Sequence, residues 1–248
     1  MKPLQVIILA GGKGTRMNSF RPKVLIELGT IPMVHRVLAA VLPVDRSPIL
    51  SVGFGGDKVI EATGGEYRYV FQDQQLGTGY AVLCAKQEAQ QQPARSTIVI
   101  PGDHPMITAE TLRRLFEVHT GESNTMTIST VRVPNFEGEY EPFATSGRVI
   151  RNEASSIEAI VELAEATPDQ KAIKEVNVSY YCFDSEWLWE NVGTLKNNNA
   201  SGEYYLTDMV GLAIGQGKKV GSYLVENPVE GLGVNTPRQL EIVQEHAP

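Results

Sequence analysis

Short apolar segments alternate with segments of helical periodicity along the first half of the chain. Residues 6–10 (VIILA) predict a strand buried on both faces, because no polar position interrupts the apolar run. Residues 33–42 (MVHRVLAAVL) predict a helix that ends before Pro43. Further strands are expected at 49–53, 67–72 and 97–100, and further helices at 57–62, 80–91 and 109–119, with Thr78 and Thr108 as N-caps.

The second half is less regular, with strands expected at 126–133, 176–183 and 219–225. Helices are expected at 185–191, 203–214 and from Pro237 onward, the last with Thr236 as its N-cap. Residues 135–147 are rich in Gly, Pro and Glu and predict an irregular excursion or lid. The repeated strand–helix order predicts an α/β fold, with a mostly parallel, Rossmann-like sheet and helices on both faces. A chain of 248 residues is long enough for one such domain, so we expect a single domain over 1–248.

Two glycine-containing turns directly follow predicted strands. Gly11-Gly12 comes after the strand at 6–10, and Gly102-Asp103 comes after the strand at 97–100. In open α/β sheets, ligands bind outside the carboxyl ends of the strands. We therefore expect both turns to open onto one crevice.

The net charge of −7 argues against a general nucleic-acid binder, which is usually basic. An acidic protein that binds phosphates must gather its cations locally, and Lys13, Arg16, Arg21 and Lys23 lie close together in the sequence. No apolar stretch approaches the roughly 20 residues of a membrane span, and 6–10 is too short for a signal sequence. We expect a cytoplasmic protein without membrane insertion; the pattern does not indicate its oligomeric state.

The two cysteines, Cys84 and Cys182, are far apart and belong to no CxxC pair. Their spacing indicates neither a zinc site nor a disulfide framework. We expect both to be small buried hydrophobic residues.

The glycine-rich segment LAGGKGTRM, Leu9–Met17, is the first candidate for chemistry. Glycines allow backbone N–H groups to approach phosphate oxygens closely. A dinucleotide-binding fingerprint would need a third glycine where Met17 stands, and the Gly217-Lys218 pair elsewhere lacks the other residues of a Walker A loop. A glycine-rich surface turn with solvated cations is the remaining alternative.

Three further segments carry candidate ligands. In PGDHP, Asp103 follows a strand and is suited to hold Mg²⁺, although a carboxylate that shapes a tight turn is the alternative; we expect His104 to have a structural or supporting role. In QLGTG, at 75–79, the glycines suit close backbone contact with a ligand, and an amide such as that of Gln72 can recognise a base edge. In GVNTP, Asn235 either brings a neutral oxygen to a metal or caps the last helix.

In this order, these motifs resemble the sugar-1-phosphate nucleotidyltransferases. The chain is most similar to the uridylyltransferase domain of the bacterial N-acetylglucosamine-1-phosphate uridylyltransferases, from about residue 4 to residue 240. The resemblance implies a nucleotide-diphospho-sugar transferase fold of the GT-A-like type, with a nucleotide half at about 1–120 and a sugar-binding half at about 121–248. The matching stretches are LAGGKGTRM, RPKVL, QLGTGYAV, PGDHP and NNNASGEYYLTDMV.

The resemblance also implies roles for individual residues. Arg16 would stabilise the departing pyrophosphate, and Lys23 would contact the reacting phosphates. Nucleotide binding would fall to Leu9, Ala10, Gly11, Gly12, Gln72, Gly77 and Thr78, with uracil recognised by Gln72 and the 77–78 backbone. The sugar would contact Gly147, Glu162 and Asn177, Mg²⁺ would be held by Asp103 and Asn235, and the GEYYLTD stretch would mainly be structural.

The sequence departs from the family pattern on the sugar side. Pro101 replaces a tyrosine, Ser146-Gly147-Arg148 replaces Gly-Tyr-Gly-Arg, 163–165 replaces a polar stretch containing a lysine, and Val178-Ser179 replaces Thr-Gly. The bifunctional bacterial enzymes continue into a β-helix acetyltransferase of hexapeptide repeats, and this sequence has no such repeats. We therefore expect neither acetyltransferase activity nor trimerisation through that domain.

The expected reaction is a magnesium-assisted in-line attack of a sugar 1-phosphate, N-acetylglucosamine 1-phosphate in the first instance, on the α-phosphorus of UTP, with loss of pyrophosphate. Two alternatives stay open at this stage. One is a transferase of the same fold that uses dTTP or CTP, or another sugar. The other is a non-catalytic sensor of nucleotide sugars, whose expected sign is the loss of Arg16, Lys23, Asp103 or Asn235; all four are present.

Overall fold

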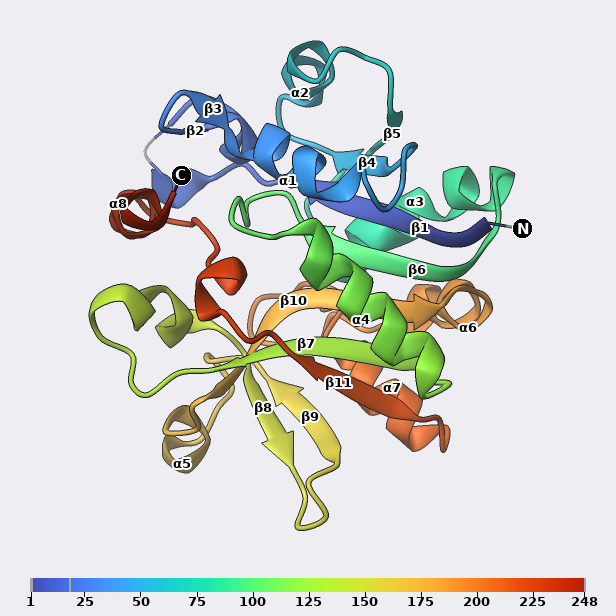
Figure 1. Cartoon of the computed structure of the whole chain (residues 1–248). Helices are drawn as coiled ribbons and strands as arrows, with labels where there is room; N and C mark the ends of the chain where they lie inside the picture. Colours follow the sequence, from blue (N-terminus) through green and yellow to red (C-terminus); the bar gives the residue numbers. More distant parts are fainter. Residues whose placement is uncertain (1, 18, 248) are drawn as a thin grey trace.

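The computed structural model describes residues 2–17 and 19–247. A nine-stranded sheet runs through the molecule. Its strands are β1 Lys2–Ala10, β4 Ile49–Val52, β5 Arg68–Phe71, β6 Ala94–Pro101, β7 Met126–Arg132, β8 Arg148–Arg151, β9 Ile157–Val161, β10 Glu175–Asp184 and β11 Val220–Leu224. The main path has the order β11-β7-β10-β6-β1-β4-β5, and β8 and β9 form a hairpin beside β10 (Figure 1). Strands β2 Glu27–Leu28 and β3 Ile31–Pro32 form a separate small ladder.

The expected α/β fold with a mostly parallel sheet is confirmed. β1 pairs in parallel with both β4 and β6, β4 pairs in parallel with β5, and β7 pairs in parallel with β11. Strand β10 runs antiparallel to β6 and β7, an inversion that the apolar pattern alone did not reveal. Because β1 and β6 share one direction, Ala10 and Pro101 end at the same edge of the sheet.

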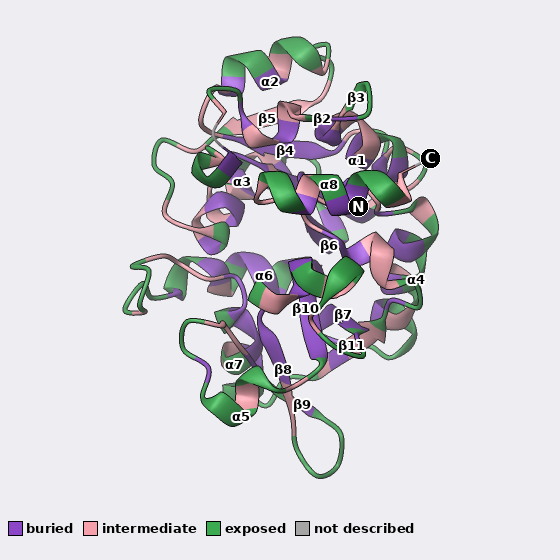
Figure 2. Cartoon of the chain, turned by 90° about the vertical axis from the view of Figure 1, so that its left-hand side faces the viewer, coloured by how far each residue is buried: buried purple, intermediate pink, exposed green. Residues whose placement is uncertain are grey.

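Helices cover both faces of the sheet. They are α1 Met33–Val41, α2 Gly56–Ala62, α3 Thr78–Gln91, α4 Ala109–Gly121, α5 Pro168–Lys171, α6 Ser185–Asn191, α7 Asp208–Gly215 and α8 Pro237–His246. Short 3-10 helices lie at Thr15–Met17, Lys23–Leu25, Gly138–Thr145, Val192–Thr194 and Pro228–Gly231. Figure 2 shows buried strands between helices whose outer faces are exposed.

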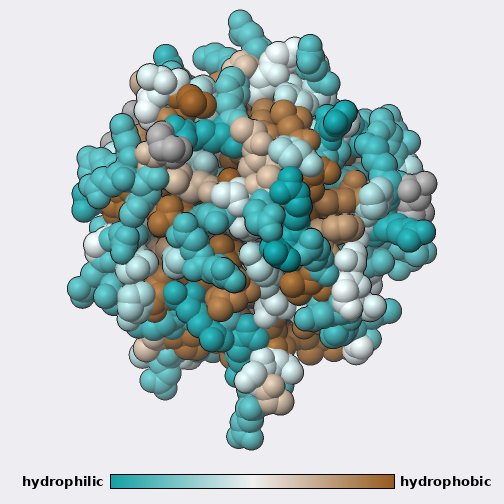
Figure 3. Space-filling view, in the orientation of Figure 1, coloured by the Kyte–Doolittle hydropathy of each residue, from teal (hydrophilic) through white to brown (hydrophobic). Residues whose placement is uncertain are grey.

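Two hydrophobic cores lie on opposite faces of the sheet, because successive side chains of a strand point to opposite sides. Val6 and Ile8 of β1 pack in the core that includes α1 and α4, whereas Ile7 packs in the core that includes α3, α6 and α7. The surface in the orientation of Figure 1 is largely hydrophilic, with hydrophobic residues scattered among polar ones (Figure 3). Within residues 2–17 and 19–247, every helix is too short or too polar to cross a lipid bilayer.

Several local expectations were correct and others were wrong. Thr108 caps α4 and Thr236 caps α8, each accepting a hydrogen bond from a backbone N–H three residues later, at 3.2 Å. Thr78, however, is the first residue of α3 rather than its cap, which is Gly77. The helix expected at 203–214 begins only at Asp208, because the preceding residues form hydrogen bonds with the 75–79 segment instead.

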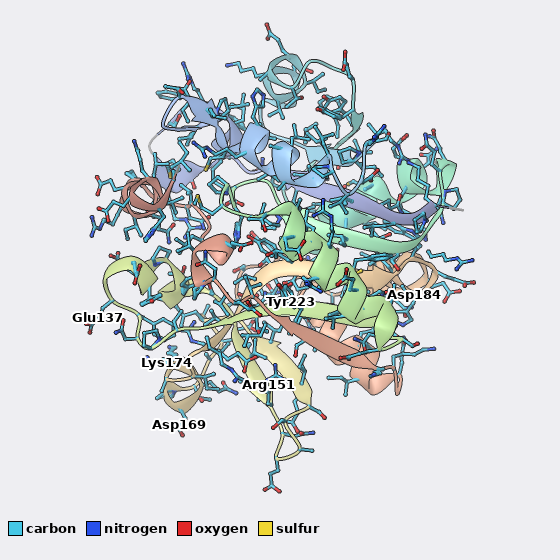
Figure 4. All side chains as sticks on the ribbon, viewed as in Figure 1. Glu137, Arg151, Asp169, Lys174, Asp184 and Tyr223 are labelled. Carbon is cyan, nitrogen blue, oxygen red and sulfur yellow. The ribbon has the colours of Figure 1, made fainter. Side chains whose placement is uncertain are left out.

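The β8–β9 hairpin and α5 were missed by the sequence reasoning, and the excursion at 135–147 contains the 3-10 helix Gly138–Thr145. The hairpin is joined to the main sheet through Arg151 of β8, which forms an ion pair of 2.6 Å with Glu175 of β10; Arg151 is labelled in Figure 4. Arg132 of β7 donates to the same carboxylate at 3.1 Å. This ion-pair cluster ties the hairpin to the end of β7.

Candidate active site

A cavity of about 510 Å³ opens at the carboxyl ends of β1 and β6. The two glycine-containing turns expected to share a crevice do so, since Gly11, Gly12 and Asp103 all line it. The predicted residues in its wall are Leu9, Gly11, Gly12, Arg16, Lys23, Gln72, Gly77, Thr78, Asp103, Glu162 and Asn235. Ala10 is the exception among the predicted nucleotide-binding residues: it does not line the cavity, and its side chain is fully buried in the α1–α4 core.

The glycine-rich loop leaves β1 and folds back against the 3-10 helix at Lys23–Leu25. Gly14 has φ of +64°, and a Cβ there would lie 2.9 Å from Lys23 Cβ, so this position needs glycine. The Lys23 N–H donates to the Gly12 carbonyl at 3.3 Å. The loop conformation therefore places Lys23 beside the glycines, at the end of β1.

Lys23 joins the two residues predicted to hold a metal. Its ammonium forms an ion pair with the Asp103 carboxylate and donates to Asn235 Oδ1 at 2.7 Å. Arg16 donates to the same Asn235 oxygen at 3.2 Å. Thr236, not Asn235, caps α8, so the capping alternative for the Asn235 side chain is excluded.

Asp103 is nearly fully buried, at 7% exposure. Burial by itself would raise the pKa of its carboxyl, but the Lys23 ammonium and the neighbouring His104 bring that pKa below its ordinary value. Asp103 is therefore an ionised carboxylate at neutral pH. This is the state that a cation at this position requires.

The donor chemistry at Asp103 and Asn235 fits a magnesium ion. One carboxylate oxygen and one neutral amide oxygen, from the end of β6 and from the loop before α8, converge on a single cation, the Lys23 ammonium. Mg²⁺ prefers oxygen ligands and usually takes one or two from protein side chains, with the rest from water and phosphates.

The other two cations of the loop point elsewhere, contrary to the expected four-residue patch. The Lys13 ammonium lies over the Phe54 ring, 5.4 Å from its centroid. Arg21 forms an exposed ion pair of 3.8 Å with Glu27. Arg16 and Lys23 alone of the four line the cavity.

The QLGTG segment is held against the segment before α7. The Gly79 N–H donates to the Tyr204 carbonyl at 2.8 Å, and the Tyr204 N–H donates to the Leu76 carbonyl at 2.7 Å. Thr78 Oγ1 accepts from the Leu206 N–H at 3.0 Å. The expected structural role of the GEYYLTD stretch thus has a physical basis: it fixes one wall of the cavity.

The amide of Gln72, expected to recognise a base, lies beside Gly11 and donates to Ser51 Oγ at 3.1 Å. Gln75, which the sequence reasoning did not select, donates to the Gly11 carbonyl at 2.8 Å and also lines the cavity. Two amides therefore flank the first glycine of the loop. Gln75 is the first residue of the QLGTG motif, so the sequence could have indicated it by its position next to the glycines of that motif.

A second cavity of about 220 Å³ contains the three predicted sugar-binding residues, Gly147, Glu162 and Asn177. Arg16, His104, Glu162, Ser179 and Asn235 line both cavities, so the two adjoin. Burial raises the pKa of the Glu162 carboxyl, with further raising by nearby acidic groups, although a hydrogen bond of 3.1 Å from Thr207 Oγ1 opposes this. The 3-10 helix at Gly138–Thr145 contributes Pro142, Phe143 and Thr145 to the wall.

Several lining residues were missed by the sequence reasoning. Ser179, Tyr181 and Glu203 line the larger cavity, as do Tyr205 and Thr207. Glu203 and Tyr205 belong to the GEYYLTD stretch, which was expected to be mainly structural. Ser179 stands at one of the departures from the family pattern, which was its signal.

His104 has contacts that fit the expected supporting role. Its Nδ1 lies 3.0 Å from the Tyr180 hydroxyl, which in turn donates to the Glu230 carbonyl at 2.6 Å. The cysteine expectation was correct for Cys182, which is buried, but Cys84 is only half-buried. Neither cysteine lines the two cavities.

Comparison with known proteins places this geometry in a family. The MobA-like NTP transferase domain matches residues 6–176, which include the glycine-rich loop, Asp103 and the β8–β9 hairpin. The chain is 41% identical over 230 residues to the Bifunctional protein GlmU of Limosilactobacillus fermentum, covering 92% of this chain and 49% of that protein. The proteins of the same name from Streptococcus agalactiae and Limosilactobacillus reuteri are 40% and 39% identical, over 92% and 95% of this chain and 48% and 50% of theirs.

The chain therefore spans about half the length of the curated relatives that it matches. The family match runs from β1 to the start of β10, so it includes the glycine-rich loop and Asp103, whereas the lining residues from Asn177 onward lie beyond it. The nine-stranded α/β architecture is that of a nucleotide-diphospho-sugar transferase. On this match, which covers well over half of its residues, the chain belongs to the MobA-like NTP transferase domain family.

Proposed function

We propose that this protein transfers a uridylyl group from UTP to a sugar 1-phosphate, N-acetylglucosamine 1-phosphate, and releases pyrophosphate. Family membership and the similarity to the GlmU proteins support nucleotidyl transfer to a sugar phosphate as the reaction class. One observation carries the proposal: Lys23 contacts both Asp103 and Asn235, and Arg16 shares the Asn235 oxygen, inside a cavity bounded by the glycine-rich loop.

In the proposed reaction, an oxygen of the acceptor phosphate forms a bond to the α-phosphorus of UTP while the bond to the β,γ-pyrophosphate breaks. The acceptor phosphate is already ionised at neutral pH, so no general base is required. Lys23 contacts the reacting phosphates, and Arg16 stabilises the negative charge that develops on the departing pyrophosphate. Catalysis then comes from positioning and from charge stabilisation in a site prepared before the reaction.

Asp103 and Asn235 would hold the metal, which we take to be Mg²⁺. When bound, such an ion supplies charge neutralisation between phosphate groups that would otherwise repel each other. Lys23 would then direct its ammonium to the phosphates rather than to the two oxygens it contacts here. The substrate's own charge would favour that change.

The larger cavity is assigned to the nucleotide and the smaller one to the sugar. Gln72, Gln75, Gly77 and Thr78 line the larger cavity and not the smaller one, which Asn177 lines, so they are suited to the base. Gly147, Glu162 and Asn177 line the smaller cavity, where a hydroxyl-rich ring needs acceptors and donors. We propose on this basis that 1–120 forms the nucleotide half and 121–248 the sugar half of one domain.

A panel assay tests the proposed substrates. Pyrophosphate release is measured with UTP, dTTP and CTP against N-acetylglucosamine 1-phosphate, glucose 1-phosphate and galactose 1-phosphate, each with Mg²⁺ and with EDTA. We expect the highest kcat/KM for UTP with N-acetylglucosamine 1-phosphate and no release with EDTA. A higher kcat/KM for another pair would correct the specificity, and no release with any pair would support the non-catalytic sensor.

A further inference from the structure

Ser179 has a backbone conformation that disfavours its own side chain. Its φ is +62°, in the left-handed region where glycine is the usual residue. For a residue with a Cβ, this region costs about 1–2 kcal/mol. Such a cost persists only where the surroundings impose the conformation, and it is often found at functional sites.

The surroundings of Ser179 impose that conformation through a bulge in β10. Opposite β7, Asn177 pairs with Thr130 and Tyr181 pairs with Ile128, so the intervening residues of β10 do not fit the regular ladder. The Asn177 Oδ1 accepts from the Ser179 N–H at 3.1 Å, and Asn177 Nδ2 donates to the Tyr181 hydroxyl at 2.7 Å. Bulges often redirect a side chain next to an active site.

The bulge brings Ser179 to the junction of the two cavities. Ser179 is one of five residues that line both. Two of the others are Arg16, assigned to the phosphates, and Asn235, assigned to the metal, and they are joined by a hydrogen bond. A third, Glu162, is assigned to the sugar. Ser179 therefore lies between the place assigned to the phosphate of the acceptor and the place assigned to its sugar ring.

We propose that Ser179 is a specificity-determining residue whose hydroxyl hydrogen-bonds the polar substituent on the carbon next to the anomeric carbon of the acceptor. This inference rests on the proposed function. An acceptor with its phosphate near Arg16 and its ring in the smaller cavity has its anomeric carbon at the junction. The adjacent carbon 2 then lies within the same region, and a serine hydroxyl can both donate to and accept from the group that it carries.

Two substitutions separate the hydroxyl from the backbone strain. Ser179→Ala removes the hydroxyl and keeps the strained φ, whereas Ser179→Gly removes both. We expect each variant to raise KM for N-acetylglucosamine 1-phosphate by about tenfold, the effect of one lost hydrogen bond, with KM for UTP unchanged. Ser179→Gly should also raise the melting temperature by about 2–4 °C, because the strain is relieved.

The structure offers a matched control in Ser155. It has φ of +63° in the exposed turn between β8 and β9, which projects away from the rest of the sheet (Figure 1), and it lines neither cavity. Ser155→Gly should give a similar gain in melting temperature and leave both KM values unchanged.

The decisive comparison uses 2-deoxyglucose 1-phosphate, which lacks the substituent, as a substrate or as a competitive inhibitor. We expect Ser179→Ala to weaken the binding of N-acetylglucosamine 1-phosphate about tenfold, and the binding of the 2-deoxy compound less than about twofold. If the substitution weakens the binding of both compounds equally, or of neither compound, the inference is overturned and the proposed function is left intact. No pyrophosphate release by the wild-type protein with any acceptor would instead overturn the proposed function, and the inference with it.

Discussion

The Lys23 ammonium donates a 2.7 Å hydrogen bond to Asn235 Oδ1, joining two residues that are 212 positions apart. The same ammonium contacts the Asp103 carboxylate. The side chains of Asp103 and Asn235 are therefore both positioned by the Lys23 ammonium. The relationship connects the glycine-rich loop near the start of the chain to the loop before α8 near its end.

Replacing Asn235 tests the proposed metal ligands. Asn235→Ala removes one of the two oxygens, so we expect the Mg²⁺ concentration for half-maximal turnover to rise by about 10–100-fold. Asn235→Asp keeps an oxygen and should require far less Mg²⁺ than the alanine variant. Asn227→Ala, at an exposed asparagine that caps a 3-10 helix, is the control. An unchanged Mg²⁺ requirement in Asn235→Ala would remove Asn235 from the metal site.

Replacing Arg16 tests the proposed stabilisation of the leaving group. We expect Arg16→Ala to lower kcat by about 10²–10³, the typical effect of removing one electrostatic donor from a transition state. Arg21→Ala is the matched control, because Arg21 lies in the same loop and pairs on the surface with Glu27. Steady-state kinetics of both variants give the comparison, and near-normal kcat in Arg16→Ala would contradict the assigned role.

Gly77 should be far more sensitive to substitution than another glycine with positive φ. A Cβ at Gly77, where φ is +99°, would lie 2.8 Å from the Tyr204 carbonyl oxygen, whereas a Cβ at Gly64, where φ is +85°, meets no atom within 4 Å. We expect Gly64→Ala to lower the free energy of unfolding by about 1 kcal/mol and Gly77→Ala by about 3 kcal/mol. Urea unfolding of both variants measures the difference; equal losses would show that the steric clash is relieved.

The Glu175 carboxylate should make stability depend on pH in the acidic range. Burial alone would raise its pKa, but hydrogen bonds and charge from Arg151 bring the pKa below its ordinary value. A lowered pKa in the folded state stabilises the protein above the unfolded pKa of about 4.3, and this contribution is lost as the pH falls through the folded-state pKa.

We therefore expect Glu175→Gln to lower the free energy of unfolding by about 1–3 kcal/mol at pH 7, where the wild-type carboxylate is charged. The difference from the wild-type protein should shrink as the pH is lowered below about 4. Denaturant unfolding across pH 3–7 measures it, with Glu158→Gln at an exposed position of β9 as the control. A difference that is constant with pH would contradict the lowered pKa.

Local patterns allowed most strands of the sheet, most helices and the turns that form the crevice to be predicted from the sequence. The apolar run at 6–10 is buried except at Leu9, which lines the larger cavity, because β1 has neighbours on both sides and helices on both faces. The start of α7 was not predictable in this way. Residues 203–207 carry helix-compatible side chains, but hydrogen bonds such as that from the Leu206 N–H to Thr78 Oγ1 hold them in another conformation.

The candidate site was harder to predict for a similar reason, because the local sequence does not show which side chains contact each other. The sequence offered four candidate cations in the loop, but the side chain of Lys13 contacts the Phe54 ring and that of Arg21 pairs with Glu27. The sequence left Asn235 open between capping and ligation; the structure excludes capping, because Thr236 is the cap, and metal ligation by Asn235 stays a proposal. Ser179 stands where the family pattern has glycine, but its positive φ could not be derived from the local residues, because it results from a bulge set by pairing with β7.

Following the α-phosphate of UTP tests the central claim most directly. The protein is incubated with N-acetylglucosamine 1-phosphate and Mg²⁺ and with UTP labelled either at the α-phosphate or at the γ-phosphate, and the products are separated. Uridylyl transfer predicts that the α label enters the nucleotide sugar and that the γ label leaves as pyrophosphate. A γ label in the sugar product, or no transfer of either label to any product, would contradict the account.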